Sequence, residues 1–273
     1  MTVKKGDRVL PGTIIAEVPE TRAIIHKVMV PPDTEGYVLD VVEDGEYTIN
    51  EPLLTLQLLD GTEKKLTMTQ KWPIRVPRPS AKRYPATRPL ITGQRILDTM
   101  FPLAKGGTAA IPGGFGTGKT MTQHQIAKWS DADVIIYIGC GERGNEMTQV
   151  LEEFSELIDP KSGNPLMDRT TLIANTSNMP VAAREASLYA GVTLAEYYRD
   201  MGYHVAIMAD STSRWQRLCV SFRPPGRDAG RGRLPGLSGI PSVFFLRESR
   251  HDAQFKRYRR FCYHYRCSFP SGR

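Results

Sequence analysis

The chain has 273 residues, 40% of them hydrophobic, which is enough for one large or two modest domains with a buried core. No run of about 18 apolar residues occurs and the polar start is not that of a signal peptide, so we expect a cytoplasmic protein without a membrane span. The net charge of +7 comes from residues 216–273, where 13 Lys plus Arg stand against 3 Asp plus Glu, so residues 1–215 carry −3. This distribution argues against a general nucleic-acid-binding protein, and the four cysteines suggest neither a disulfide framework nor a metal site.

Residues 1–75 are predicted to form a small all-β domain, a sandwich or barrel. Short β-prone runs alternate there with turn-forming pairs such as Pro11-Gly12 and Asp44-Gly45. Lys27 loosely resembles the swinging-arm lysine of lipoyl-type domains, but no tight turn presents it, so an exposed lysine on a structural strand is favoured. The expected strands are Thr13 to Val18, Ala23 to Val30, Gly36 to Val42 and Leu53 to Leu59.

Residues 76–91 are predicted to be an extended connector and a domain boundary, because proline fixes φ and removes hydrogen-bond donors. Prolines and basic residues alternate along this stretch. A helix is expected to begin near Thr92 and to reach Asp98.

The segment from Gly113 to Thr120 fits the pattern of a phosphate-binding loop, a glycine and four residues followed by Gly-Lys-Thr. Four of its eight residues are glycine, which allows the backbone N–H groups to turn inward onto phosphate oxygens. Lys119 would neutralise the β- and γ-phosphates, and the Thr120 hydroxyl would hold Mg²⁺. The residues expected to bind the nucleotide are Gly113, Gly114, Phe115, Gly116, Thr117, Gly118, Lys119, Thr120 and Met121.

The flanks of this loop have the order that it requires. Residues 108–111 are a short apolar run suited to a buried strand, and residues 121–129 lack Gly and Pro and are predicted to be helical. A helix that opens at Lys119 directs its N-terminal N–H groups and positive dipole end at a bound anion.

Strands and helices alternate in the remainder of the chain up to residue 215. This alternation predicts an α/β fold, a parallel sheet covered by helices, with ligands outside the carboxyl ends of the strands. The expected strands are residues 134–138, 171–174 and 205–208, and the expected helices are residues 145–158 and 180–201.

Two carboxylates follow predicted strands at the edge where a ligand is expected. Asp210 ends the strand that starts at Val205, which suits a carboxylate that holds Mg²⁺ through water, although it could instead cap the following turn. Glu142 lies in a predicted flexible loop, where it could aim a water molecule at the γ-phosphorus, with Arg143 available to orient it or to bridge to a neighbour. Glu146, one helical turn on, is the weaker candidate for a base.

Six motifs, at residues 92–95, 101–107, 113–120, 139–146, 175–187 and 210–215, have sequences that are also found together in one family. In these motifs the chain resembles the catalytic A subunit of the V/A-type rotary ATPases. The resemblance implies a RecA-like P-loop NTPase core at residues 92–215, with residues 1–75 as the inserted β domain that distinguishes this subunit from its F-type relatives. It also implies that Lys119 and Thr120 bind MgATP or ADP, that Glu142 positions the hydrolytic water and that Asp210 serves the metal.

The resemblance further implies a set of partners and a location. These are B subunits in an alternating A/B hexamer that supply an arginine finger, central stalk subunits, a peripheral stalk that binds the insert, and, indirectly, a membrane sector that moves H⁺ or Na⁺. The protein would lie on the cytoplasmic face of the membrane and bind no nucleic acid. The alternatives are a RecA-like hexameric helicase and a non-catalytic nucleotide-binding subunit; the first would need residues 1–75 to be more basic, and Lys119 with Glu142 disfavours the second.

The chain departs from the family pattern at Gly114, where proline is common, at Thr117, where the eukaryotic form has a redox-sensitive cysteine, and throughout residues 216–273. We chose codons that the genetic code permits for the residues after Trp215, and added one base directly after Trp215 and one in a later run of T. The shifted reading then encodes Ala-Glu-Ala-Leu-Arg-Glu-Phe-Ser-Gly-Arg-Leu-Glu-Glu-Met-Pro, which is similar to the family sequence. A shifted reading of residues 261–270 gives Ser-Val-Thr-Ile-Ile-Gly-Ala-Val-Ser-Pro, also family-like. We therefore interpret residues 216–273 as an out-of-frame, disordered tail on a fragment that is inactive alone.

Overall fold

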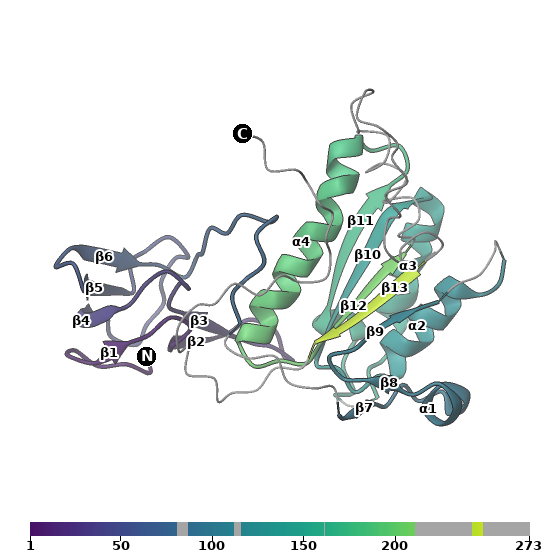
Figure 1. Ribbon diagram of the computed structural model, residues 1–273, viewed down its shortest axis with the longest axis horizontal. Helices are drawn as coiled ribbons and strands as arrows, with labels where there is room; N and C mark the ends of the chain where they lie inside the picture. The colour runs from purple at the N-terminus through teal and green to yellow at the C-terminus, as the bar shows by residue number, and fades with distance from the viewer. Residues whose placement is uncertain (81–86, 112–115, 161, 211–241, 248–273) are drawn as a thin grey trace, which may run out of the picture.

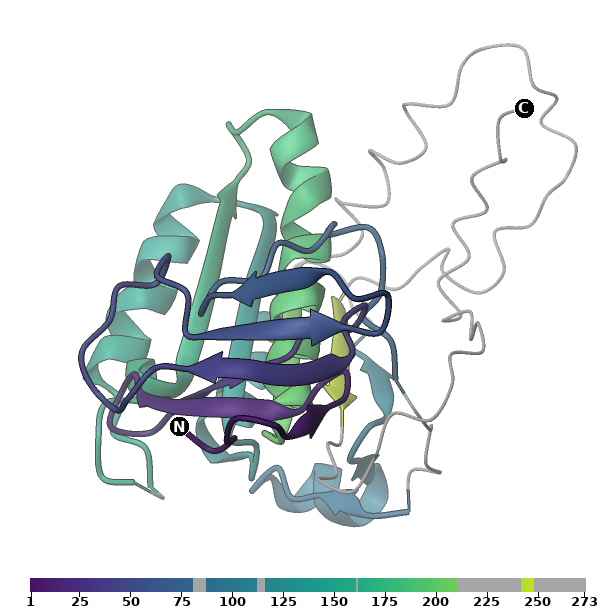
Figure 2. The same ribbon diagram turned by 90° about the vertical axis from the view of Figure 1, so that its left-hand side faces the viewer.

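The computed structural model describes residues 1–80, 87–111, 116–160, 162–210 and 242–247. Residues 1–66 form the all-β part (Figures 1 and 2), with a four-stranded antiparallel sheet in the order β1-β4-β5-β6 and a separate hairpin of β2 and β3. Ile15, Val38 and Leu56 are among the side chains buried between them. The strands are β1 Arg8–Val9, β2 Ile14–Pro19, β3 Ile25–Met29, β4 Gly36–Val41, β5 Leu54–Leu58 and β6 Glu63–Leu66.

The four strands predicted in this part are confirmed, to within two residues at their ends. Two further strands were not predicted: β1, which has two residues, and β6, whose sequence Glu-Lys-Lys-Leu is mostly charged. Both are recognisable only from their pairing, β1 with β4 and β6 with β5. Short or charged edge strands carry little intrinsic β-propensity.

The second part of the described chain is a three-layer α/β/α arrangement around a five-stranded sheet in the order β11-β10-β12-β13-β9 (Figure 1). A short antiparallel pair, β7 with β8, and helix α1 precede it. The elements are β7 Pro89–Leu90, α1 Arg95–Met100, β8 Leu103–Ala104, β9 Thr108–Ala110, α2 Lys119–Trp129, β10 Val134–Glu142, α3 Gly144–Glu156, the 3₁₀ helix η1 Leu166–Arg169, β11 Thr170–Thr176, α4 Val181–Asp200, β12 Val205–Asp210 and β13 Ser242–Arg247.

Alternate residues of β10 face the two helical layers, as the period of a strand requires. Ile135 and Tyr137 belong to the cluster beneath α2 and α3, whereas Ile136 and Ile138 belong to the cluster beneath α4. All nine residues of β10 are buried, so the strand is a continuous apolar run until its carboxyl end. The predicted strands and helices of this part are confirmed in type and order.

Strand β13 differs from the expectation of a disordered tail. It lies between β12 and β9 and runs antiparallel to both, with Asp210 opposite Ser242 and Ala110 opposite Val243. Its sequence, Ser-Val-Phe-Phe-Leu-Arg, is rich in β-branched and aromatic residues, which favour extended pairing beside open strand edges. Residues 211–241 and 248–273, and with them the rest of that prediction, lie outside the described residues.

The all-β part contacts the carboxyl end of α4 through hydrogen bonds from several residues of β3. The Nε2 of His26 lies 2.9 Å from the Tyr197 hydroxyl, and the Ile25 N–H donates to the Tyr203 hydroxyl at 2.9 Å. Lys27 donates to the Met201 carbonyl at 3.2 Å and is partly buried, so its prediction as an exposed lysine is wrong. Its packing against a helix far along the chain could not be deduced from the surrounding strand.

The connector is anchored by Arg78, which is 3% exposed. Its Nε donates to Asp200 at 2.8 Å, its backbone N–H donates to Glu196 at 2.6 Å, and its guanidinium lies 5.2 Å from the ring centroids of both Trp72 and Tyr197. At least this part of the predicted extended connector is therefore packed against α4.

Among the described residues, no helix combines the length and apolar character needed to cross a membrane.

Candidate active site

The second half of the phosphate-loop motif lies at the amino end of α2. Gly116 and Gly118 both have φ near 79°, the left-handed region that glycine adopts without strain. A Cβ at either position would meet no described atom within 4 Å, so conformation rather than crowding calls for glycine. Gly118 is the N-cap and has no side chain to occupy the first N–H groups of the helix, which suits binding of an anion there.

Helix α2 begins at Lys119, as the sequence predicts, and the side chains of Lys119 and Thr120 are partly exposed. Met121 follows in the first turn and is 52% exposed. Gly113, Gly114 and Phe115, predicted to bind the same ligand, lie outside the described residues.

Thr120 and Asp210 lie in contact although 90 residues separate them in sequence. The Thr120 hydroxyl donates to Oδ2 of Asp210 at 2.5 Å, and Asp210 is 4% exposed. Asp210 ends β12, opposite Gly139 of β10, so it lies at the carboxyl edge of the parallel strands. The two residues predicted to share a metal are thus brought together, as expected from a helix and a strand that meet at this edge.

These two residues fit a Mg²⁺ ion. A hydroxyl and a buried carboxylate are oxygen donors of the type that Mg²⁺ takes, and phosphate oxygens and water normally supply the rest of its shell. Within the described ranges, no group of three or more His, Cys, Asp or Glu side chains is arranged to hold a metal. The pair would accordingly hold Mg²⁺ together with a bound phosphate group, where the ion neutralises phosphate charge.

Glu142 is the last residue of β10, and the prediction that it lies in a flexible loop is wrong. Its pairing partner is Thr176 at the end of β11, and the register between the two strands shifts between Cys140 and Glu142. Its carbonyl accepts the N–H of Ser177 at 2.8 Å, and the residue is 7% exposed. The strand continues past the apolar run because the neighbouring β11 extends equally far, which the sequence of β10 alone does not reveal.

Arg143 is the N-cap of α3, and its guanidinium lies 3.8 Å from the carboxylate of Glu146 in a largely exposed ion pair. Glu146 is in the first turn of that helix, where an acidic side chain favours the dipole. This placement agrees with the interpretation of Glu146 as a helix-starting charge.

The carboxylates of Asp210 and Glu142 act on the same two buried groups of β10. Burial, then the charge of Asp210 and that of Glu142, raise the pKa of the Cys140 thiol to about 12. The same three causes raise the pKa of the Tyr137 hydroxyl well above its usual value of 10.0. Tyr137 also makes a long 3.5 Å contact with Asp210. Both charges therefore belong to one local environment at the end of the sheet.

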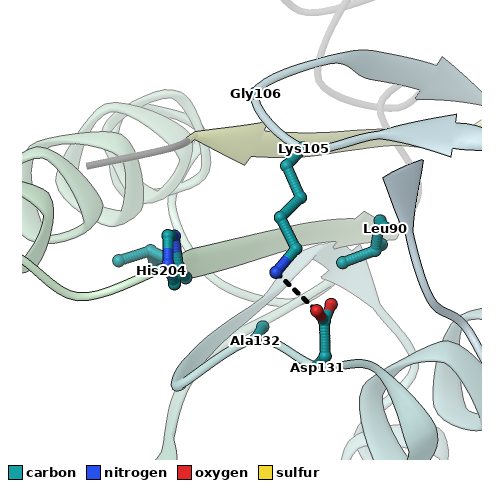
Figure 3. Close-up of a pocket in the computed structure, with 7 residues that line it drawn as sticks. Leu90, Lys105, Gly106, Asp131, Ala132 and His204 are labelled. Carbon is teal, nitrogen blue, oxygen red and sulfur yellow. Dashed lines mark ion pairs between the residues drawn. The ribbon is translucent and has the colours of Figure 1, made fainter. Parts of the chain in front are cut away.

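Two hollows in the described part of the protein lie away from these carboxylates. One is a cavity of about 10 Å³ lined by Lys105, Asp131 and His204, among others. Figure 3 shows these residues and the ion pair of Lys105 and Asp131. His204 precedes β12, so it lies at the end of that strand opposite to Asp210. The cavity has room for about one water molecule. A larger hollow of about 270 Å³ lies on the all-β part, between Pro31, Lys64 and Trp72. Neither contains a residue predicted to bind nucleotide.

A family model for the nucleotide-binding domain of the ATP synthase alpha/beta family matches residues 93–242. The chain belongs to the ATP synthase alpha/beta family. A second model, the ATP synthase alpha/beta subunit barrel-sandwich domain, matches residues 1–75. The predicted fold class, a P-loop α/β core preceded by a small all-β domain, is confirmed by these two matches and by the observed sheets.

Relatives within this family have names that agree with the predicted V/A-type. A V-type ATP synthase alpha chain of Halothermothrix orenii is 64% identical over 88% of this chain and 40% of the relative. The A subunit of the A-type ATP synthase of Thermococcus sibiricus is 63% identical over the same shares. The recognition of a V/A-type A subunit is confirmed, and the chain spans about two fifths of the length of these curated relatives.

A more distant likeness concerns a solved structure. An ATPase from the type III secretion system of pathogenic bacteria is 26% identical, with a TM-score of 0.45, over 60% of this chain and 44% of that chain. At that TM-score the likeness supports no structural conclusion.

Two residues that lie beside Glu142 had no role assigned to them from the sequence. Gly141 precedes it with φ at 78°, and the side chain of Arg184, near the amino end of α4, lies against Gly141. Both belong to motifs that carry the family resemblance, 139–146 and 175–187, and that membership was the available signal. Their contact depends on tertiary packing and has no signature in either segment alone.

Proposed function

We propose that the complete subunit to which this chain corresponds binds MgATP and hydrolyses or forms it, as the catalytic A subunit of a V/A-type ATPase coupled to H⁺ or Na⁺ transport. The observation that carries the proposal is the contact of the Thr120 hydroxyl with Asp210, at the edge of the sheet where Glu142 ends the adjacent strand. A P-loop threonine, a strand-end carboxylate and a nearby glutamate are the parts that phosphoryl transfer to water requires.

Each residue has a separate role in this proposal. Lys119 balances charge on the β- and γ-phosphates, and Thr120 with Asp210 holds Mg²⁺. The Glu142 carboxylate accepts a hydrogen bond from the attacking water and aligns it with the γ-phosphorus, and Arg143 stands beside it at the start of α3. A regulatory site needs phosphate contacts but no such carboxylate, so Glu142 favours a catalytic over a non-catalytic subunit.

The assembly proposed for the subunit is an alternating A/B hexamer on the cytoplasmic face of a membrane. An arginine from the adjacent B subunit would stabilise charge on the transferring phosphoryl group. Central stalk subunits and a peripheral stalk, the latter on the all-β insert, would link the hexamer to the membrane sector. The chain alone is expected to be inactive because the arginine comes from another subunit.

We further propose domains at residues 1–75 and 92–215, joined by the connector 76–91, with residues 216–273 out of frame. The family-like sequences that a shifted reading restores support the last point. Resequencing the locus tests it: an intact run of bases that encodes residues 216–273 as written would refute the frame shift.

The test of the catalytic role uses Glu142→Gln in an assembled A/B complex whose A subunit has this chain's sequence at residues 1–210. We expect MgATP binding to persist while turnover falls by about 100-fold or more, because the amide cannot accept the proton or orient the water in the same way. Glu146→Gln is the matched control, a carboxylate one helical turn away, and should change turnover by less than about threefold. Unchanged turnover in the Glu142 variant would remove Glu142 from its role.

A further inference from the structure

The side chain of Arg184 lies directly against the backbone that precedes Glu142. A Cβ built on Gly141 would be 2.7 Å from Nε and 2.8 Å from Cδ of Arg184, closer than real Cβ atoms come to other atoms. Gly141 also has a positive φ of 78°. Glycine at this position therefore serves two purposes, since it permits the backbone conformation and leaves the space that Arg184 fills.

A relay of hydrogen bonds joins Arg184 to the main chain of Glu142. The Nη2 of Arg184 donates to the Ser177 carbonyl at 2.7 Å, and the Ser177 N–H donates to the Glu142 carbonyl at 2.8 Å. Arg184 thus lies against Gly141 on one side and on the other binds Ser177, which is the hydrogen-bond partner of Glu142. The strand pairing shifts register at this point, so the regular ladder of β10 and β11 does not define the position of Glu142 by itself.

Helix α4 holds the backbone of Arg184 in a fixed position. The 20-residue helix packs along the sheet through Leu188 and Ala195, which are at most 8% exposed. The backbone N–H of Arg184 bonds to the Pro180 carbonyl at 3.2 Å, so the residue lies in the ordered first turns of the helix. Its guanidinium is consequently held by a rigid element rather than by a loop.

We propose that Arg184 is a positioning residue for Glu142. By bracing Gly141 and Ser177, it keeps the main chain at the end of β10 in place and so sets the direction of the Glu142 carboxylate. The proposal rests on the proposed function, in which that carboxylate orients the attacking water. In this proposal Arg184 acts through Glu142 rather than on the nucleotide or the water. A displacement of about 1 Å at such a group can reduce turnover by about 100-fold.

The test compares Arg184→Met and Arg184→Lys in the same assembled A/B complex. Methionine keeps the length of the side chain but donates no hydrogen bond, so we expect kcat to fall by about 10- to 100-fold while KM for MgATP stays within about threefold. Lysine can donate to the Ser177 carbonyl and should recover part of kcat. Arg75→Met is the control, because Arg75 pairs with Glu185, the next residue of α4, and does not contact the Glu142 segment in the structure.

A double-mutant cycle with Glu142→Gln separates positioning from general stability. If Arg184 acts through Glu142, Arg184→Met should cause little further loss of kcat in the Glu142→Gln background. The proposal for Arg184 would be overturned if Arg184→Met lowered kcat equally with Glu142 and with Gln at position 142, or if it did not lower kcat when Glu142 is present. If Glu142→Gln itself leaves turnover unchanged, the proposed function fails instead.

A second variant keeps the proposal testable if Arg184→Met does not assemble. Gly141→Ala retains the guanidinium but places a methyl group where Arg184 lies, and it should lower kcat with the same dependence on Glu142. Unchanged kcat in Gly141→Ala would count against the bracing contact.

Discussion

At the scale of one residue, the thiol of Cys140 shows how burial and the two carboxylates of the site change the pKa of a neighbouring group. It lies fully buried in β10, and its thiol has a pKa raised to about 12 by burial and by the charges of Asp210 and Glu142. The raised value means that the thiolate, which is the reactive form, is scarce at neutral pH. It also means that the protonated thiol stabilises the fold below pH 9.0, and that this contribution is lost as the pH rises towards 12.

We therefore predict that Cys140 resists thiol reagents in the folded chain at pH 8. A variant with the other three cysteines changed to serine isolates its reaction with an aromatic disulfide reagent, followed by absorbance. Labelling should be slow in buffer, complete in denaturant, and faster as the pH increases above 9. Labelling in buffer at the rate of a free cysteine would show that the thiol is not buried. The three cysteines to be replaced are Cys219, Cys262 and Cys267.

Single residues also show which contacts of the site could be predicted from the sequence. The pairing of Thr120 with Asp210 followed from a local motif and a strand end, because the topology of parallel sheets brings such ends together. Arg184 could not be assigned in this way, since its role depends on how close α4 approaches Gly141. Close approach of a side chain to a strand backbone is set by packing, and only the identity of the glycine hints at it.

At the scale of elements, helix α4 lies close against the sheet at Gly191. A Cβ there would lie 2.3 Å from Cδ1 of Ile138 and 3.2 Å from Cδ1 of Ile173. Ile138 is 0% exposed, so it has little room to move aside. Alanine is the better helix former, by about 1 kcal/mol, but overpacking in a closed core costs about 1–3 kcal/mol.

Gly191→Ala is accordingly expected to lower the free energy of unfolding by up to about 2 kcal/mol, as measured by urea denaturation. Ile138→Val removes the clashing methyl group, so the double variant should be more stable than the sum of the two single effects predicts. Gly144→Ala is the control, because a Cβ at Gly144, in the first turn of α3, meets no described atom within 4 Å. A stabilised Gly191→Ala protein would show that α4 can move away from β10.

The element boundaries were predicted less well than the elements themselves. Pro180 was placed in the first turn of the long helix, and it is the N-cap, one residue earlier. Strand β10 was predicted to end at residue 138, and it continues to Glu142. The glycines at 139 and 141 favoured a loop, but pairing with β11 and β12 overrode that local preference.

At the scale of the whole molecule, Arg78 joins the connector to the nucleotide-binding part. It is nearly completely buried, and its Nε donates to a carboxylate oxygen of Asp200, which also pairs with Arg199. Removal of one partner from a buried ion pair leaves the other charge poorly compensated. The prolines around Arg78 predicted an extended chain, but not that this arginine would be enclosed.

Arg78→Met should lower the free energy of unfolding by about 3 kcal/mol in urea denaturation. Arg75→Met provides the comparison, because Arg75 lies three residues away in the same connector, its side chain is 65% exposed and it pairs with Glu185. That variant should cost less than about 1 kcal/mol. Equal effects of the two substitutions would indicate that Arg78 contributes no more than a surface ion pair.

Strand β9 has a consequence for the order of folding. In the described sheet its pairing partner is β13, so the strand that leads into the phosphate loop is joined to β12 only through residues 242–247. Contacts between segments so far apart in sequence close a long loop and form late in folding. During synthesis of the chain as written, β10, β11 and β12 can pair as soon as residue 210 has left the ribosome, whereas β9 must wait for residues 242–247, which emerge later. Strand β9, which leads into the nucleotide loop, is thus fixed in the sheet after the strands that end in Asp210 and Glu142.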